Sequence, residues 1–440
     1  MELQQFFIIL YLVVLVILSS VNPRIALLFF FTTKFTLDIF WDSAVIDGLN
    51  ILKITGVLFP LFCTLYVITK RHWIDEHPFG KTLIILFGLN CLASLWGLLN
   101  SHFLLLPLPH SPLTLKHVLD WNFRFLNIAS VFLIVPYILS GSVDRIIFLK
   151  AFLISTIIPC LISWYQLSSS SINQLVTKVS EPYSVSSFQR LDATYHDPGT
   201  LSLVMFTGII LSVFLLVNEK ARSIKIIYGL YALLCSIILY FTFSRTLWIS
   251  ITLFLVAFFI FQQKYKILLA VIIIAVSVFT LIPLTQKRFE RELTWIDRGE
   301  ILSNPTEIQK LGTGRIWLWN DARKHFLKLD IISKLIGSGG SFGSHNQYIA
   351  WLLRNGILGL AVWLFFLYKM GAFLWLKFKE DSGEPTAGFV FVLFFIVIGV
   401  TNIFMQPWDN TTFAYFFWSL IGIYLFQESK AFNINAAECV

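Results

Sequence analysis

The chain is poor in charged residues and poor in cysteine. Only 13% of its 440 residues are Asp, Glu, Lys or Arg, about half the share of an ordinary soluble domain. Its five cysteines include no CxxC pair, so we expect neither a disulfide framework nor a metal cluster. The formal net charge of +8 does not indicate a nucleic-acid partner, because basic connections between membrane spans account for much of it.

Apolar residues dominate instead. Hydrophobic types make up 57% of the chain, Phe alone occurs 44 times, and the mean hydropathy is +0.77. Apolar runs close to the roughly 20 residues that cross a bilayer recur along the sequence. We therefore predict an all-α, polytopic integral membrane protein that forms one domain over residues 1–440. The predicted spans lie near residues 6–21, 25–41, 50–69, 82–100, 119–139, 146–167, 198–217, 224–243, 246–262, 267–284, 346–376, 387–405 and 412–426.

Basic residues in the short connections orient these spans. Four Lys/Arg-rich connections are expected to be cytoplasmic: residues 69–72, 218–225, 263–266 and 377–380. Alternation then places four others on the periplasmic side: residues 102–118, 168–197, 244–246 and 285–344. The count is 13 spans, or 12 if Lys34 and Asp38 prevent the second run from crossing.

The predicted large periplasmic loop, residues 285–344, contains an amphipathic pattern. Its apolar residues recur at three- and four-residue spacing, which predicts a helix lying on the membrane face or on the spans. These residues are Leu318, Trp319, Ala322, Phe326 and Leu329. Arg315 stands at the expected helix start, where backbone N–H groups and the helix dipole favour phosphate. The alternative is that Arg315 only solvates the helix end.

Two further arginines fall on the same predicted side. Arg190 shortly precedes a span, and Arg245 lies in a short hairpin with few polar neighbours. An ionisable residue at membrane depth is a functional candidate, although Arg245 can also reach the headgroups as a snorkelling side chain. Arg354 follows His345 by nine residues in the same predicted helix, on roughly the opposite face, so we expect it to serve packing or topology.

The segment YHDPGT suggests a rival chemistry. His196, Asp192 and Asp197 could together hold a divalent cation for phosphoryl or glycosyl transfer. A helix start explains the same residues more simply, because Asp197 suits an N-cap and Pro198 suits the first helical turn. We therefore expect no metal here.

A glycine and serine run precedes a His-Asn pair in GSGGSFGSHNQY. Glycines such as Gly339 and Gly340 permit unusual backbone angles and close approach to a substrate. The run leads into a helix that we expect to begin at His345. His345 is then either a general base or only a cap or interface residue.

The stretch HNQYIAWLLRNGILG resembles the signature of the O-antigen ligase and O-antigen polymerase superfamily. SRT at a hairpin, GTGRIWLW and LIGSGGSFGSHN in one loop, and an arginine before DPGT are similar features. The resemblance implies a glycosyltransferase of the bacterial inner membrane that acts at the periplasmic face. Such an enzyme moves a glycan from undecaprenyl diphosphate to a hydroxyl of lipid A-core, without a nucleotide sugar, an obligate metal or another cofactor.

The resemblance also implies roles for particular residues. Arg190, Arg245 and Arg315 would hold the diphosphate in place of a metal, and His345 would deprotonate the acceptor hydroxyl. Asn346 would orient the acceptor or the imidazole, unless it only caps the helix. A single in-line attack would invert the anomeric centre.

Two alternatives stay open. A polymerase of the same superfamily would use the same donor but extend another lipid-linked glycan; the motif spacing and the single large loop favour the ligase. A lipid-linked oligosaccharide flippase or another transporter would instead predict charges lining a central path through the spans.

Overall fold

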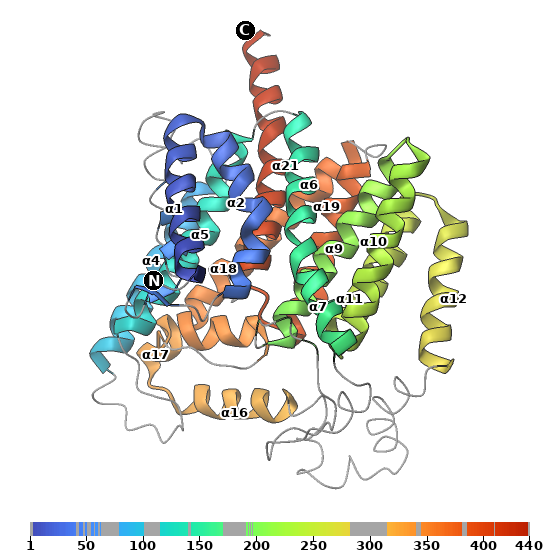
Figure 1. Cartoon of the computed structure of the whole chain (residues 1–440). Helices are drawn as coiled ribbons and strands as arrows, with labels where there is room; N and C mark the ends of the chain where they lie inside the picture. The colour runs from blue at the N-terminus through green and yellow to red at the C-terminus, as the bar shows by residue number, and fades with distance from the viewer. Residues whose placement is uncertain are drawn as a thin grey trace, which may run out of the picture. The chain divides into compact units, whose positions relative to one another are not determined.

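A computed structural model gives the fold of the chain (Figure 1). It describes residues 3–40, 44–46, 49–50, 54–56, 58–59, 62, 79–100, 115–139, 142–169, 191, 193, 195, 197–281, 315–339, 345–380, 385–408 and 410–438. Nearly all of these are helical; besides turns and short connections they include one short antiparallel pair of strands, β1 (Ala44–Ile46) with β2 (Leu49–Asn50). The all-α prediction is thus confirmed for the part of the chain that the structure describes.

The helices follow the apolar runs. They are α1 (Leu3–Val21), α2 (Pro23–Leu37), η1 (Asp38–Phe40), α4 (Gly80–Asn100), α5 (Leu115–Ile138), α6 (Ser142–Ser155), α7 (Ile157–Ser169), α9 (Pro198–Asn218), α10 (Arg222–Phe241), α11 (Arg245–Phe261), α12 (Tyr265–Leu281), α16 (Arg315–Lys328), α17 (Ile331–Ile336), α18 (Gln347–Glu380), α19 (Pro385–Ile396), the π-helical turn η3 (Val397–Thr401), α20 (Asn402–Phe404) and α21 (Thr411–Glu438).

Seven helical segments in the described ranges are long and apolar enough to cross a membrane. They are Gly80–Asn100, Trp121–Ile138, Asp144–Ser168, Pro198–Asn218, Arg222–Phe241, Gln347–Glu380 and Pro385–Phe404. Shorter apolar helices cover Phe6–Val21, Arg245–Phe261 and Phe413–Leu425. The protein is therefore membrane-embedded by its helices, while the count of 12 or 13 spans and the side of the 285–344 loop stay predictions.

The chain forms two compact units that interleave along the sequence. The first unit comprises Met1–Lys81, Phe123–Ile251 and Pro407–Val440, and the second comprises Thr82–Asn122 and Thr252–Gln406. Each unit is thus assembled from segments far apart in the chain. The single integral domain over residues 1–440 stays a prediction.

In the first unit, α9 is the central helix and α10 lies outside it. In the apolar stretch of α9 that could cross a membrane, 78% of the residues are buried, whereas in the corresponding stretch of α10 only 17% are buried. The sequence explains the contrast: α9 is apolar on all sides, as a buried helix must be, and its Gly208 lets α10 approach until a Cβ there would lie 3.0 Å from Cys235 Sγ. The exposed Ile227 and Leu230 of α10 suit contact with lipid.

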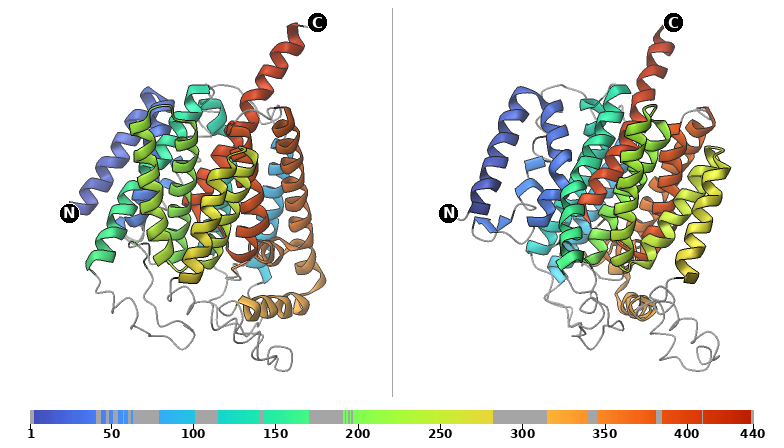
Figure 2. Two further views of the ribbon diagram at one scale, coloured as in Figure 1. Left: turned by 90° about the vertical axis from the view of Figure 1, so that its right-hand side faces the viewer. Right: turned by 45° about the vertical axis from the view of Figure 1, so that its right-hand side comes forward.

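In the second unit, aromatic rings join α11 to α19. Phe254 and Phe258 stack along α11, and both meet the ring of Phe389 edge-on. The direction of α16 differs from that of α19 in the same unit: in Figure 1, α16 lies horizontally and α19 stands upright, and the views of Figure 2 agree. The amphipathic pattern predicted a helix that lies on the membrane face or on the spans, and the direction of α16 suits either arrangement.

Candidate functional site

Helix α18 is broken at Gly356. This residue has φ 65° and ψ −171°, so the helix consists of a short segment, Gln347–Asn355, and a long one that follows it. In a continuous helix, the carbonyls of Leu353 and Arg354 would accept hydrogen bonds from the N–H groups four residues further along. Here they accept instead from Ser338 N and Gly339 N, at 3.0 Å each. The sequence predicted one unbroken span here, and the break is a correction to it. Non-helical backbone of this kind is tolerated in a membrane protein where other protein atoms satisfy its polar groups.

Two glycines make this arrangement possible. At Gly337, with φ 96°, a Cβ would lie 2.5 Å from the carbonyl carbon of Arg354 and 2.6 Å from Asn355 Cα. At Gly356 a Cβ would lie 2.5 Å from Gly337 N. Any side chain at either place would collide with backbone, and both positions require positive φ. We call residues 337–339 together with the break at Gly356 the glycine crossing.

The predicted substrate glycines have different outcomes. Gly339 is buried, its N–H is bonded to Arg354 O, and a Cβ there would lie 2.5 Å from Ala93 O of α4. The close approach that Gly339 permits is therefore to the protein's own backbone. Gly340 lies outside the described residues.

His345 and Asn346 immediately precede the short segment of α18. The sequence predicted that the helix begins at His345, but it begins at Gln347. Asn346 is buried, and its Oδ1 accepts a hydrogen bond from Ile349 N at 3.0 Å. Asn346 therefore caps the helix, which is one of the two roles that the sequence suggested for it. His345 is exposed and has φ 50°. Non-glycine residues rarely adopt this conformation, and such outliers concentrate at functional sites.

The glycine crossing is surrounded by polar and aromatic side chains of the second unit. Asn122 Nδ2 donates to Ser94 Oγ at 3.1 Å, and Trp96 Nε1 donates to Ser333 Oγ at 3.0 Å. The Arg354 guanidinium lies 3.6 Å from the ring centroid of Trp121, and the arginine is only 6% exposed. This cation–π contact agrees with the packing role that the sequence assigned to Arg354.

Arg315 is the first residue of α16, as predicted. The apolar face of α16 also matches the prediction, since Ala322 and Leu329 are almost fully buried. Ala322 packs with Leu353 of α18, and Phe326 and Ile349 lie against them. The helices that begin at Arg315 and just after His345 therefore pack on each other within one unit.

Arg245 belongs to the first unit. It is half-buried and begins α11 directly after a tight turn in which Phe243 has φ 52°. Trp248 Nε1 closes the hairpin by donating to Leu239 O at 3.1 Å. Of the four predicted catalytic residues, Arg315 and His345 thus share one unit, Arg245 is in the other, and Arg190 lies outside the described residues.

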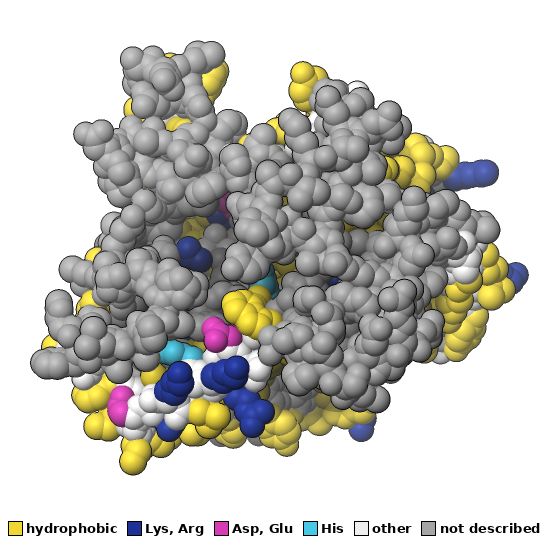
Figure 3. Space-filling model, turned by 90° about the horizontal axis from the view of Figure 1, so that it is seen from below, with side chains coloured by type: hydrophobic (Ala, Val, Ile, Leu, Met, Phe, Trp, Pro, Cys, Tyr) yellow, Lys and Arg dark blue, Asp and Glu magenta, His cyan; other side chains and the backbone are white. Residues whose placement is uncertain are grey.

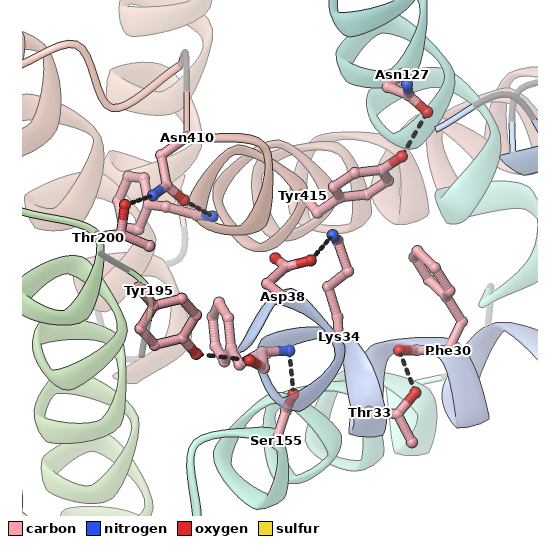
Figure 4. Close-up of polar contacts among 12 residues, drawn as sticks. Phe30, Thr33, Lys34, Asp38, Asn127, Ser155, Tyr195, Thr200, Asn410 and Tyr415 are labelled. Atoms are coloured by element: carbon pink, nitrogen blue, oxygen red, sulfur yellow. Dashed lines mark hydrogen bonds and ion pairs between the residues drawn. The ribbon is translucent and has the colours of Figure 1, made fainter. Parts of the chain in front are cut away.

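Asp197 caps α9, which confirms the simpler interpretation of YHDPGT. Its Oδ1 accepts from Gly199 N at 2.9 Å, and its Oδ2 accepts from Thr200 N at 2.9 Å and from Thr200 Oγ1 at 2.8 Å. Thr200 Oγ1 also accepts from Asn410 Nδ2 at 2.9 Å, which links the start of α9 to the start of α21 (Figure 4). The other two residues of the rival metal site, Asp192 and His196, lie outside the described residues.

A buried ion pair in the first unit was not recognised as a site from the sequence. Lys34 Nζ lies 2.5 Å from Asp38 Oδ1, and each side chain is 3% exposed (Figure 4). Lys34 Nζ is also 5.3 Å from the ring centroid of Tyr415, whose hydroxyl bonds to the side-chain oxygen of Asn127. The sequence carried a signal, namely two opposite charges four residues apart in an apolar run, but the same pattern also predicts an irregular span.

Buried ion pairs of this kind seldom add stability over an apolar pair, and ionisable residues inside a membrane protein are candidates for function. Asp38 Oδ2 has no hydrogen-bond partner in the described part of the chain. Beside the pair, Tyr195 OH donates to Phe35 O of α2 at 2.6 Å. The pair therefore lies near Tyr195, the first residue of the YHDPGT motif.

No protein-family model matches the chain, and no curated protein matches it significantly.

Proposed function

We propose that the protein is an O-antigen ligase-like glycosyltransferase, which moves a glycan from undecaprenyl diphosphate to a hydroxyl of lipid A-core at the periplasmic face. The observation that supports it is the arrangement of the signature residues. His345 and Asn346 stand at the start of a nine-residue helical segment that ends where Gly356 meets Gly337. The histidine is thereby presented, exposed and in an uncommon backbone conformation, on a fixed backbone support.

In the proposed reaction, His345 accepts the proton of the acceptor hydroxyl as that oxygen bonds to the anomeric carbon. The bond between this carbon and the phosphate oxygen breaks, and its electron pair leaves with undecaprenyl diphosphate. Arg190, Arg245 and Arg315 stabilise the charge on the leaving diphosphate through bidentate contacts. Asn346 fixes the helix start that follows the histidine.

Deletion of the gene tests this function. Loss of a ligase leaves bare lipopolysaccharide core on a gel, together with accumulated lipid-linked polymer. Core that carries a single repeat would show a polymerase instead. Lipid-linked glycan retained on the cytoplasmic face would show a flippase, a class for which the buried Lys34–Asp38 pair is a suitable feature.

Two biochemical measurements test the mechanism. Transfer by purified protein is expected to persist in EDTA; loss that magnesium or manganese restores would revive the site at Asp192, His196 and Asp197. Cysteines placed beside Arg190, Arg245, Arg315 and His345 are expected to react with a membrane-impermeant reagent from the periplasm. Reaction only after permeabilisation would contradict a shared periplasmic site.

A further inference from the structure

The outward side of α16 and α17 combines apolar and basic residues. Packing on α18 uses the side of α16 that holds Ala322 and Phe326. On the remaining side, Trp317 is 47% exposed and Leu327 is 59% exposed, and Ile331 at the start of α17 is 75% exposed. We call these three residues, with the exposed Arg323, Lys324 and Lys328, the α16–α17 surface.

Basic side chains outnumber acidic ones on α16 and α17: five basic residues stand against two acidic ones, namely Arg315, Arg323, Lys324, Lys328 and Lys334 against Asp321 and Asp330. Seen from below, basic side chains gather on α16 next to apolar ones (Figure 3). Asp330 adjoins them and caps α17, since its Oδ1 accepts from Ser333 N at 2.9 Å and its Oδ2 from Ser333 Oγ at 2.6 Å. The surface therefore offers an anion three cationic side chains beside three large apolar ones.

The direction of α16 identifies what such a surface meets. Within the second unit, α16 lies horizontally in Figure 1, whereas α19 stands upright. Because α19 belongs to a segment long and apolar enough to cross a membrane, α16 lies along the plane of a membrane that α19 would cross. Helices in this position insert apolar side chains at the boundary of headgroups and acyl chains. Tryptophan is enriched at that depth, and Lys and Arg are attracted there by anionic lipids.

We propose that the α16–α17 surface binds the headgroups of anionic phospholipids. The three basic residues contact phosphate groups, while Trp317, Leu327 and Ile331 enter the layer beneath. A soluble protein partner is disfavoured because large apolar side chains stand among the cations on a helix that lies in the membrane plane. The proposal is independent of glycosyl transfer, because it concerns ordinary phospholipid and no donor glycan.

The test uses the full chain in nanodiscs. Leu327→Cys, made after the five native cysteines are replaced by serine, carries an environment-sensitive fluorophore. We expect its emission to shift to the blue, and quenching by doxyl-labelled lipid to increase, when half of the phosphatidylcholine is replaced by phosphatidylglycerol. No donor lipid is present, so the response reports phospholipid alone.

Charge reversal provides the decisive comparison. The triple variant Arg323→Glu, Lys324→Glu, Lys328→Glu is expected to lose the difference between the two lipid mixtures. The matched control Lys264→Glu, Lys266→Glu reverses exposed charges at the connection of α11 and α12 and is expected to retain it. Equal emission of the unreversed protein in both mixtures would overturn the proposal, as would a lipid response that survives the triple reversal. Monodisperse elution and an unchanged thermal midpoint establish that each variant is folded.

Discussion

Gly337 lies so close to Arg354 that a Cβ atom on the glycine would stand 2.5 Å from the arginine carbonyl carbon. This contact joins the end of the predicted large loop to the break in α18. Ser338 and Gly339 continue it by bonding to the two carbonyls that the break leaves available. Residues 337–339 and the end of the short segment of α18 are thus held together by backbone hydrogen bonds, and a rigid support of this kind positions a site more precisely than a loop does.

Alanine at Gly356 is expected to destabilise the protein by about 2 kcal/mol or more, because the left-handed conformation and the collision with Gly337 N both oppose a side chain. Gly88→Ala in α4 is the matched control. A Cβ at Gly88 meets no atom within 4 Å, and alanine favours a helix, so this change is expected to be neutral or stabilising. Thermal unfolding in detergent compares the two. Equal midpoints for Gly356→Ala and the native protein would contradict the glycine crossing.

Removal of one member of the Lys34–Asp38 pair is expected to cost about 3–5 kcal/mol, because it leaves a buried charge without its partner. Lys34→Met and Asp38→Leu are the single changes. The double variant is expected to recover most of this loss, since an apolar pair suits the site at least as well. Denaturant unfolding completes the double-mutant cycle. If the double variant is stable but fails to complement the deletion strain, the charges serve function; additive losses would show that the two residues are not coupled.

His345→Ala is expected to slow glycan transfer by roughly 10² to 10⁴ while donor binding changes little, because proton transfer matters only in the transition state. Asn346→Asp keeps an oxygen that can cap the helix, so it is expected to fold normally; Asn346→Ala is expected to lose about 1 kcal/mol of stability. Transfer rate and donor affinity of the purified variants are the measurements. Full transfer by His345→Ala would leave the histidine only a residue at a helix start.

Arg315→Ala is expected to lower both donor affinity and transfer rate, because the proposed phosphate contact exists before and during reaction. Arg245→Ala is expected to behave in the same way. Lysine should rescue either position poorly, since it retains the charge but lacks the planar fork of two donors. Binding of the lipid diphosphate by each variant provides the comparison. Unchanged affinity with alanine would assign Arg315 to solvation of the helix end.

Docking of α16 is expected to weaken in acid through His325. Burial lowers the pKa of His325 below its ordinary value of 6.5, an effect that Lys328 reinforces and Asp321 opposes. The folded state therefore disfavours the proton, so the unfolded state binds it first as the pH falls below 6.5 and stability is lost. Hydrogen exchange of α16 at about pH 7.5 and about pH 5.5, corrected for intrinsic rates, measures this. His325→Gln is expected to flatten the response; an equal response in both proteins would exclude His325 as its source.

Local sequence determined where several helices begin and which faces they bury. Asp197 and Pro198 specify the start of α9 because a cap and a first-turn proline act on atoms within a few residues. The spacing of Ala322, Phe326 and Leu329 specified α16 and its buried face, since helical periodicity is a property of neighbouring residues. The apolar runs likewise determined a helical membrane protein, because lipid leaves backbone groups no partner outside the helix.

Tertiary structure alone decided how the candidate site is built. The run from 346 to 376 has the composition of one span, and its break at Gly356 follows from a contact with Gly337, which lies outside that run. Lys34 and Asp38 resembled an interruption of a span until the fold enclosed them beside Tyr415. Both features depend on atoms that meet only after distant segments pack. Residue spacing encodes interactions within a helix, but not which backbone or ring a residue meets across the fold.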